Sequence, residues 1–286
     1  MRTELVVVNR QRIPYRVPTF VKWAGGKTQL LEQLKVFLPD HIDRYFEPFV
    51  GSGTLFFFVK QHLQPREIVL SDSVAELVNS YQIIRDKVDE LIDALTLHKK
   101  NHSKEYYYRI RQTDPASLTA VGQAARFLYL NKTCFNGLYR VNSKGIFNVP
   151  MGRYANPSIV KPNVLREAGA LLQNVRVQKR DFSTIVSEAR QGDFVYFDPP
   201  YYPLSNTANF TSYTKNPFLE DQQKKLCTAY RELDNKGCLL MQSNSSTDFI
   251  RSLYKGFRIE TVRARRIINS NAMKRGAISE LVILNY

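Results

Sequence analysis

Cysteines and long apolar segments are both scarce in this chain of 286 residues. Its three cysteines, Cys134, Cys227 and Cys238, are far apart, so none forms the close pair that binds zinc or carries redox chemistry. No apolar run reaches the roughly 18 residues that span a bilayer, and the N-terminus lacks the charged-then-apolar pattern of a signal peptide. We therefore expect ordinary buried thiols, no membrane contact and a cytoplasmic location.

Metal ligands at a useful spacing are lacking as well. His98 and His102 could share one face of a helix, but no acidic neighbour stands at ligand spacing beside them. We predict that the protein holds no metal.

Acidic residues are missing from two long stretches. The chain has 41 lysines and arginines against 26 acidic residues, for a net charge of +15. No Asp or Glu occurs between positions 115 and 166, where the basic residues are Arg126, Lys132, Arg140, Lys144, Arg153, Lys161 and Arg166. A second run has Glu260 as its one acidic residue and contains Arg251, Lys255, Arg258, Arg263, Arg265, Arg266, Lys274 and Arg275. A single such residue is ordinarily solvated surface, but two blocks indicate a polyanionic partner. Neither block has an apolar face at helical spacing, so nucleic acid is favoured over a membrane surface.

A short motif after an apolar run indicates chemistry on an amino group. The strand-like Phe194–Phe197 is followed directly by Asp198-Pro199-Pro200-Tyr201. The exocyclic amino group of adenine is a poor nucleophile, because its lone pair is delocalised into the ring, so both its hydrogens need acceptors while a methyl group approaches. Asp198 would accept one N–H, a prolyl carbonyl held rigid by Pro200 the other, and Tyr201 would stack on a base taken out of the duplex. The alternative is a turn that merely ends a strand.

Apolar runs bounded by turn residues predict an open α/β sheet with crossover helices. The expected strands are 45–46, 67–70, 175–177, 194–197, 238–241, 258–262 and 281–284. A helix is expected over 221–233, led by acidic residues, and an antiparallel strand pair at the C-terminus. The first fifteen or so residues are expected to form an arginine-rich arm with an extended segment at Leu5–Val8. Residues from about 75 to 162 carry helical patterns without a buried strand, which indicates an insertion at the carboxyl ends of the sheet, where such folds bind ligands.

A glycine-rich loop predicts a nucleoside site. Gly51 and Gly53 follow the 45–46 strand, and Asp72 ends the next strand about twenty residues later, where a carboxylate can bind ribose hydroxyls. The absent third glycine and Pro48 favour a single adenosyl group over a dinucleotide. Gly26-Lys27-Thr28 resembles the end of a phosphate-binding loop, but Val21 stands where that motif requires glycine and Trp23 would crowd the phosphate, so nucleotide hydrolysis is disfavoured.

Five blocks in one order carry a resemblance that covers nearly the whole chain after the arm. They are 20–27 (FVKWAGGK), 46–53 (FEPFVGSG), 136–140 (NGLYR), 147–154 (FNVPMGRY) and 198–201 (DPPY). In this the chain resembles the Dam-type, DpnM-like adenine-N6 DNA methyltransferases of class alpha. The resemblance implies a Rossmann-like sheet of the S-adenosylmethionine-dependent type, with core segments 1–75 and 165–286 and an inserted, mainly helical DNA-recognition domain at 76–164.

The resemblance also implies the residues that would hold the methyl donor, S-adenosylmethionine. Trp23, Ala24, Gly25 and Lys27 would line its methionine end, while Glu47 and the loop Phe49, Gly51, Ser52 and Gly53 would supply further contacts. Asp72 would hold the ribose, Asp181 and Phe182 the adenine ring, and Asp198 would adjoin the reacting group. From the residues alone, a core aromatic is the favoured interpretation of Trp23.

For DNA, the resemblance implies double-stranded GATC as the target. Arg140 would read a guanine edge, worth about 1–3 kcal/mol per bidentate contact, although a surface salt bridge is the alternative. Leu138 and Tyr154 would contact neighbouring bases, Asn136 would lie near the gap left by the flipped base, and Asn142 and Arg153 would complete the DNA surface. Methylation of cytosine N4, or of an RNA or protein amide, stays open, as does a non-catalytic DNA-binding module. A companion restriction endonuclease at the same DNA site and a solitary regulatory role are both open too.

Overall fold

The computed structural model describes residues 16–142, 144–204, 218–265 and 277–286. The arm with Leu5–Val8, and the basic residues Arg266, Lys274 and Arg275, lie outside the described residues. Within the described part, no helix is long and apolar enough to cross a membrane, and no group of three or more His, Cys, Asp or Glu side chains is placed to hold a metal ion.

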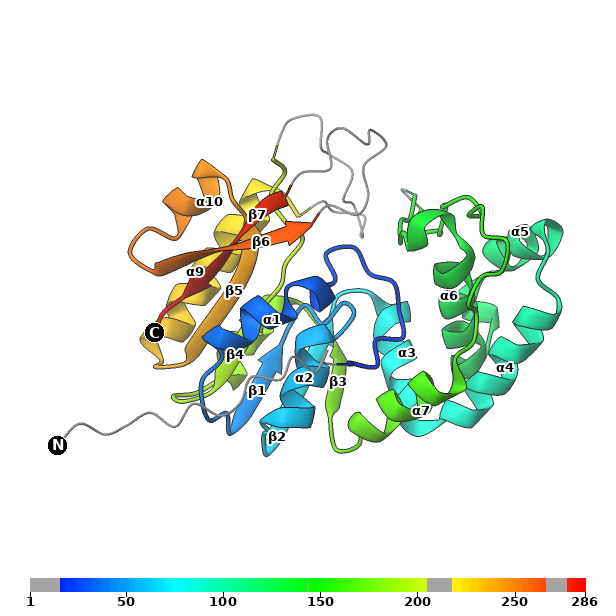
Figure 1. The fold of residues 1–286 in the computed structure, drawn as a ribbon, viewed down its shortest axis with the longest axis horizontal. Coiled ribbons are helices and arrows are strands. Elements are labelled where there is room, and N and C mark those ends of the chain that lie inside the picture. The colour runs from blue at the N-terminus through cyan, green and yellow to red at the C-terminus, as the bar shows by residue number, and fades with distance from the viewer. Residues whose placement is uncertain (1–15, 143, 205–217, 266–276) are drawn as a thin grey trace.

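A seven-stranded sheet runs through the molecule in the order β3-β2-β1-β4-β5-β7-β6 (Figure 1). The strands are β1 (Arg44–Glu47), β2 (Glu67–Asp72), β3 (Arg176–Lys179), β4 (Phe194–Phe197), β5 (Leu239–Ser245), β6 (Arg258–Arg265) and β7 (Ala277–Leu284). β7 is antiparallel to both β5 and β6, and the other neighbouring pairs are parallel. The predicted strands and the C-terminal antiparallel pair are confirmed.

Successive apolar side chains along the strands point to opposite sides of the sheet, and both faces of the sheet are buried. Tyr196 of β4 joins one cluster, with helices α2 (Thr54–His62), α3 (Ala75–Asp86) and α7 (Pro162–Leu171), whereas its neighbours Val195 and Phe197 join another, with α9 (Glu220–Asn235) and α10 (Asp248–Leu253). Successive strand residues point to opposite faces, so an uninterrupted apolar run is what a strand covered on both sides requires. The helix predicted at 221–233 is α9.

Between β2 and β3 the chain forms a helical region at the far side of the molecule from β6 and β7 (Figure 1). It contains α3, α4 (Val88–Lys100), α5 (Lys104–Gln112), α6 (Ala120–Thr133) and α7, and its described residues include no strand beyond two isolated bridges. α1 (Leu31–Leu34) and α8 (Ile185–Glu188) are single turns elsewhere. His98 and His102 bond the hydroxyls of Tyr106 and Tyr129, at 2.7 and 2.8 Å, so both belong to the packing of this region.

One residue counted among the surface charges is internal. Arg126 of α6 is 2% exposed, and its Nη1 lies 2.9 Å from Glu76 Oε1. Its Nε and Nη2 donate to the carbonyls of Ile110 and Arg111, so the guanidinium bonds α5, α6 and the start of α3 together. Arg126 therefore adds nothing to a surface field, unlike the exposed Arg140 and Arg153 in the same stretch.

Candidate active site

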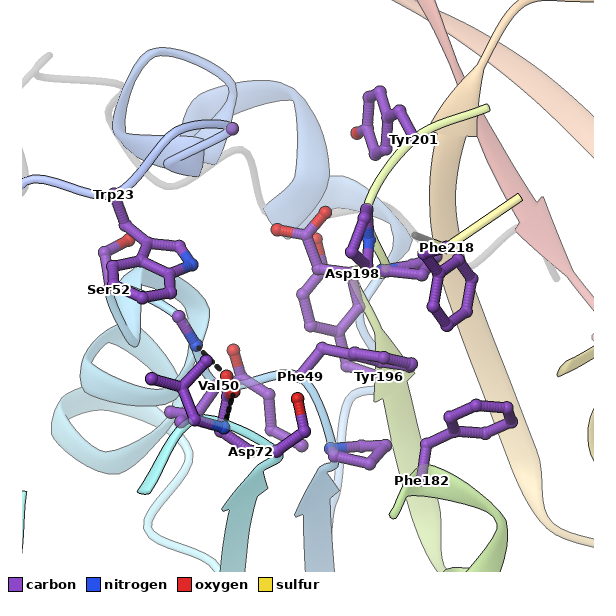
Figure 2. A pocket seen from close by; sticks show the side chains of 18 of the residues that line it. Trp23, Phe49, Val50, Ser52, Asp72, Phe182, Tyr196, Asp198, Tyr201 and Phe218 are labelled. Carbon is purple, nitrogen blue, oxygen red and sulfur yellow. Dashed lines mark hydrogen bonds between the residues drawn. The ribbon is translucent and has the colours of Figure 1, made fainter. Parts of the chain in front are cut away.

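The site forms where the chain order of the strands reverses. β1 is flanked by β2 on one side and by β4 on the other, so their carboxyl ends diverge at this point, which is where open α/β sheets bind ligands. Glu47 ends β1 and Asp198 follows β4, and both face a cavity of about 600 Å³. Figure 2 shows Asp198 between Tyr196 and Tyr201, with Trp23 across the cavity from them.

The cavity gathers most of the residues that the sequence singled out. Those lining it are Trp23, Ala24, Gly25, Lys27, Glu47, Phe49, Gly51, Ser52, Asp72, Asp181, Phe182, Asp198, Pro199, Pro200 and Tyr201. Further lining residues that were not predicted include Val50, Thr54, Arg180, Tyr196, Phe218 and Lys225. Gly53 is not in the lining; it lies behind the loop, where a Cβ would approach Tyr81 Oη to 2.5 Å.

The glycine loop is shaped by Trp23. Gly51 has φ +47°, and a Cβ there would lie 2.8 Å from Trp23 Cδ1. Tyr81 Oη donates to the Gly51 carbonyl from below, at 3.1 Å. Only glycine has both the backbone freedom and the space that this position needs, so the loop and the indole ring form one wall of the cavity.

Asp72 fixes the other side of the same loop. Its Oδ2 accepts from Gly51 N at 3.3 Å, and its Oδ1 accepts from Val74 N at 3.0 Å. Burial raises the pKa of Asp72 to about 6, and these backbone N–H donors oppose the rise. The carboxylate therefore orders the ends of β1 and β2 while still facing the cavity.

The tetrapeptide after β4 is held by buried amides. Gln223 of α9 donates from Nε2 to the Pro200 carbonyl at 2.9 Å, and Asn244 of β5 donates to Gln223 Oε1 at 3.0 Å. Asn244 Oδ1 in turn accepts from Tyr202 N at 3.3 Å. Gln223 and Asn244 are fully buried, so the backbone around Pro200 is fixed from beneath.

The side chains of Asp198 and Tyr201 in the tetrapeptide each bond a charged partner. Asp198 Oδ1 lies 2.7 Å from Lys27 Nζ, and Tyr201 Oη donates to Glu280 Oε2 of β7 at 2.7 Å. Burial raises the pKa of Asp198 to about 6, although Lys27 lowers it. Burial also raises the pKa of Glu47 to about 8, while the hydroxyl of Tyr45, which donates to Glu47 at 2.7 Å, lowers it.

Aromatic rings form the end of the cavity beyond Asp198. Phe49 stacks on Phe182, with centroids 5.3 Å apart and planes at 28°, and Phe218 packs edge-on against both rings. Asp181 begins the short helical turn that contains Phe182 and accepts from Ser183 N and from Lys225 Nζ. This end suits a flat heterocycle, because aromatic rings offer apolar faces for stacking.

None of the predicted DNA-binding residues lines the cavity. All six lie on the segment 136–154 after α6, where Asn136, Leu138, Arg140 and Arg153 are exposed and Asn142 and Tyr154 are half-buried. A short hairpin contains two of them: Asn148 N donates to the Arg140 carbonyl, Asn142 N to the Ile146 carbonyl, and Val141 bridges Phe147. Arg140 Nε donates to Asn148 Oδ1 at 2.8 Å, and among the described residues this arginine forms no salt bridge.

This segment reaches the cavity through residues that were not predicted. The Nζ of Lys22 lies 4.3 Å from the Tyr154 ring centroid, and Lys22 adjoins Trp23 in the chain. Asn131 accepts from Lys22 N and donates to the carbonyls of Lys22 and Gly137, which ties the two loops together. The exposed segment and the cavity are therefore adjacent at Trp23.

Comparison with known proteins agrees with this geometry. The family model described as "D12 class N6 adenine-specific DNA methyltransferase" matches residues 23–268. The chain belongs to this family. It is 43% identical over 273 residues to "Type II methyltransferase M1.LlaDCHI" of Lactococcus lactis subsp. cremoris, covering 93% of this chain and 95% of that protein. It is also 43% identical over 287 residues to "Type II methyltransferase M.MjaIII" of Methanocaldococcus jannaschii (94% and 99% covered), and 35% identical over 268 residues to the "DNA adenine methylase" of Serratia marcescens (93% and 97% covered).

The protein is thus an adenine-specific DNA methyltransferase with a Rossmann-like sheet, and membership of the family implies S-adenosylmethionine as the methyl donor. The cavity suits this donor. It joins the buried carboxyl groups of Glu47 and Asp72 and the half-buried one of Asp198 with an aromatic end, and the donor joins a cationic sulfonium and ammonium group with an adenine ring.

Sequence patterns had no means of finding several residues of the site. Gln223 and Glu280 are ordinary members of a helix and a strand in the sequence, and their contacts are with distant residues. A buried polar residue within an apolar strand, such as Asn244 in β5, is the one signal that a careful search could have used.

Proposed function

We propose that this enzyme methylates the adenine of GATC in double-stranded DNA, with the donor in the cavity and the target base turned out of the duplex against Asp198-Pro199-Pro200-Tyr201. The observation that carries the proposal is the Asp198 carboxylate, which faces a cavity large enough for donor and base beside a backbone fixed by Gln223. The donor supplies an electrophilic methyl group on a sulfonium. The residues of the chain hold and orient both partners.

The donor half of the cavity is assigned by charge and shape. We assign Asp72 to the ribose hydroxyls, and Asp181 and Phe182, with Phe49 and Phe218, to the adenine ring. Glu47 and the segment Trp23 to Lys27 are then left for the methionine end of the donor. Buried carboxylates favour a cationic ligand, because ion pairing offsets the cost of their burial.

The part of the cavity around Asp198 would orient N6 of the target adenine. Lys27 holds Asp198 Oδ1, so Oδ2 is the oxygen that we expect to accept one N6–H. Gln223 occupies the Pro200 carbonyl, so the carbonyl between Pro199 and Pro200 is the one that we assign to the second N6–H. Tyr201, held by Glu280, stacks on the base. Both acceptors would turn the nitrogen lone pair toward the methyl group of the donor. Transfer would form the N6–C bond as the S–C bond breaks and leaves a neutral thioether, and N6 would then release its surplus proton to water.

We assign target recognition to the segment 136–154. With Nε bonded to Asn148, Arg140 presents its two terminal nitrogens outward, the arrangement that reads guanine O6 and N7 in the major groove. We assign Leu138 and Tyr154 to neighbouring bases, Asn136 to the gap left by the flipped base, and Asn142 and Arg153 to the surrounding DNA.

We divide the chain accordingly. Residues 1–75 and 165–286 form the methyltransferase core, and residues 76–164 form the recognition part. α3 packs beside β2 and β3 and also against α6, so it would connect the two parts. The names of the two Type II relatives support a restriction endonuclease as a companion in the cell.

A nuclease challenge tests the proposal directly. Unmethylated DNA is incubated with the enzyme and S-adenosylmethionine, then digested with one nuclease that cuts only unmethylated GATC and another that cuts only methylated GATC. We expect protection from the first and cutting by the second, with N6-methyladenine found by nucleoside mass measurement. Methylation at another sequence would overturn GATC, and N4-methylcytosine would overturn the choice of base.

The variant Asp198→Asn tests the role of the carboxylate. It keeps the shape of the side chain but loses a charge-assisted hydrogen bond of about 3 kcal/mol, so kcat should fall about a hundredfold or more while DNA binding persists. Near-normal methylation by this variant would contradict the assignment.

A further inference from the structure

Tyr139 lies in the segment 136–154, and its side chain packs on Trp23 at the wall of the donor cavity. It stands between Leu138 and Arg140, which are exposed, yet its own side chain is half-buried. Its ring stacks on Trp23, with centroids 5.7 Å apart and planes at 26°, and also contacts Phe127 and Phe147. One residue of the segment 136–154, referred to below as the recognition loop, thus packs on Trp23, which lines the donor cavity.

The hydroxyl of Tyr139 bonds the helix that follows another part of the cavity wall, residues 72–74. It donates to Glu76 Oε2 at 2.9 Å, and Glu76 Oε1 bonds Arg126 at 2.9 Å. Glu76 lies in the first turn of α3, directly after the loop that begins at Asp72. Tyr139 therefore connects to the Trp23 side through its ring and to the Asp72 side through its hydroxyl.

These contacts leave little freedom for independent movement. Trp23 is packed between the Gly51 loop, where a Cβ would come within 2.8 Å of its ring, and the face of Tyr139. Asn131 additionally bonds the main chain of Lys22 and Gly137, at 2.7 to 3.1 Å. A shift of the Gly51 loop or of Trp23 must therefore be accommodated at Tyr139, because closely packed side chains transmit displacement.

We propose that Tyr139 is a positioning residue that couples occupation of the donor cavity to the arrangement of the recognition loop, through its stack on Trp23 and its hydrogen bond to Glu76. A donor against Trp23 and Asp72 fixes both supports of Tyr139, and Tyr139 then fixes Leu138 and Arg140 for the target sequence. Coupling of this kind is reciprocal, so target DNA must tighten donor binding by the same factor. The inference rests on the proposed roles of the cavity and of the segment 136–154.

The test measures this coupling in the full-length protein. S-adenosylhomocysteine serves as an unreactive donor analogue, and the DNA is a fluorescent GATC duplex or a duplex of the same composition with the site scrambled. For the unaltered protein we expect the analogue to tighten GATC binding about tenfold, within the usual range of 5 to 150-fold, and to leave scrambled DNA within about twofold.

Two variants separate the ring from the hydroxyl. Tyr139→Leu removes both contacts, so the coupling factor should fall to about twofold or less, while the Kd of the analogue alone changes by less than about threefold. Tyr139→Phe keeps the stack and loses the bond to Glu76, so its coupling factor should lie between those of the unaltered protein and Tyr139→Leu. In the double variant with Trp23→Leu, loss of Tyr139 should cause no further loss of coupling, because the two residues act as one unit.

The outcomes distinguish this inference from the proposed function. Full coupling in a folded Tyr139→Leu protein overturns the inference, as does an unaltered protein that methylates GATC without any coupling. Should Tyr139→Leu fail to fold, Tyr139→Phe decides, since coupling equal to that of the unaltered protein would overturn the role of the Glu76 bond on which the inference depends. If the unaltered protein neither binds the analogue nor methylates DNA, the proposed function itself is contradicted.

Discussion

Lys27 Nζ lies 2.7 Å from Asp198 Oδ1, and the Lys27 and Asp198 side chains are only 4% and 19% exposed. The same ammonium group donates to the Gly25 carbonyl at 2.6 Å and lies 4.8 Å from the centroid of the Tyr201 ring. Lys27 thus links the loop that follows Trp23 to both Asp198 and Tyr201 of the tetrapeptide. An isolated buried carboxylate would be protonated near neutral pH, so this ion pair keeps Asp198 an acceptor.

Replacing Lys27 with glutamine should move the pH profile of methylation. The pKa of Asp198, about 6, is already raised by burial and is held down by Lys27, so Lys27→Gln should raise it by a further unit or so. The ionised carboxylate is the active form, and activity is lost as pH falls through the pKa. The acidic limb of kcat/KM should therefore shift about one pH unit upward, whereas Lys27→Arg should leave it in place. An unshifted limb in Lys27→Gln would disprove the electrostatic role.

Neutralising Glu47 should stabilise the ligand-free protein at alkaline pH. Burial raises the pKa of Glu47 from 4.5 to about 8, so folding favours the protonated form and stability is lost as pH rises between these values. Glu47→Gln removes this loss, so its free energy of unfolding should exceed that of the unaltered protein at pH 9 by a few kcal/mol and match it near pH 5. Urea unfolding at both pH values measures the difference.

The same variant should bind the donor less well. An ionised Glu47 favours a cation, so S-adenosylmethionine should stabilise the unaltered protein more at pH 8 than at pH 5.5, and Glu47→Gln should lose that increase. Glu90→Gln, at a side chain 60% exposed, is the matched control and should change neither measurement. Equal stability of Glu47→Gln and the unaltered protein at pH 9 would show that folding does not raise the pKa of Glu47.

The sheet was predictable because its signal is local. Each central strand is a short apolar run between turn residues, and burial on both faces makes that run continuous, as at Phe194–Phe197. The tetrapeptide and the Gly51 loop were predictable for a similar reason, since each carries its chemistry within a few adjacent residues. The order of the strands then brings Glu47 and Asp198 to one point.

The supports of the site were not predictable, because they depend on distant pairs. Tyr201 and Glu280 are 79 residues apart, and Tyr139 and Glu76 are 63 apart. Nothing in the local pattern of either partner indicates the other. Arg126 shows the same limit for charge. Composition counts the residue as basic, but it does not indicate that Arg126 is buried in the helical region, where it bonds Glu76 and two main-chain carbonyls.

Tyr201 should contribute to base capture through its ring and to orientation through its hydroxyl. Tyr201→Ala removes a stack worth about 1–3 kcal/mol, so a duplex with 2-aminopurine at the target adenine should show a much smaller rise in fluorescence on binding. Tyr201→Phe keeps the ring and loses only the bond to Glu280, so the fluorescence rise should persist while kcat falls a few-fold. A full fluorescence response from Tyr201→Ala would show that another residue captures the base.

Gly51→Ala should damage donor binding beyond its effect on backbone strain, and Gly192→Ala measures the strain alone. Gly51 and Gly192 have φ of +47° and +85°, so each alanine should cost about 1–2 kcal/mol of stability in urea unfolding. A Cβ at Gly192 meets nothing within 4 Å, whereas one at Gly51 lies 2.8 Å from Trp23 Cδ1 and must displace the indole ring from the cavity wall. Calorimetry with S-adenosylhomocysteine should therefore show a Kd at least about tenfold weaker for Gly51→Ala and unchanged for Gly192→Ala. Equal affinities in the two variants would mean that Trp23 does not position the donor.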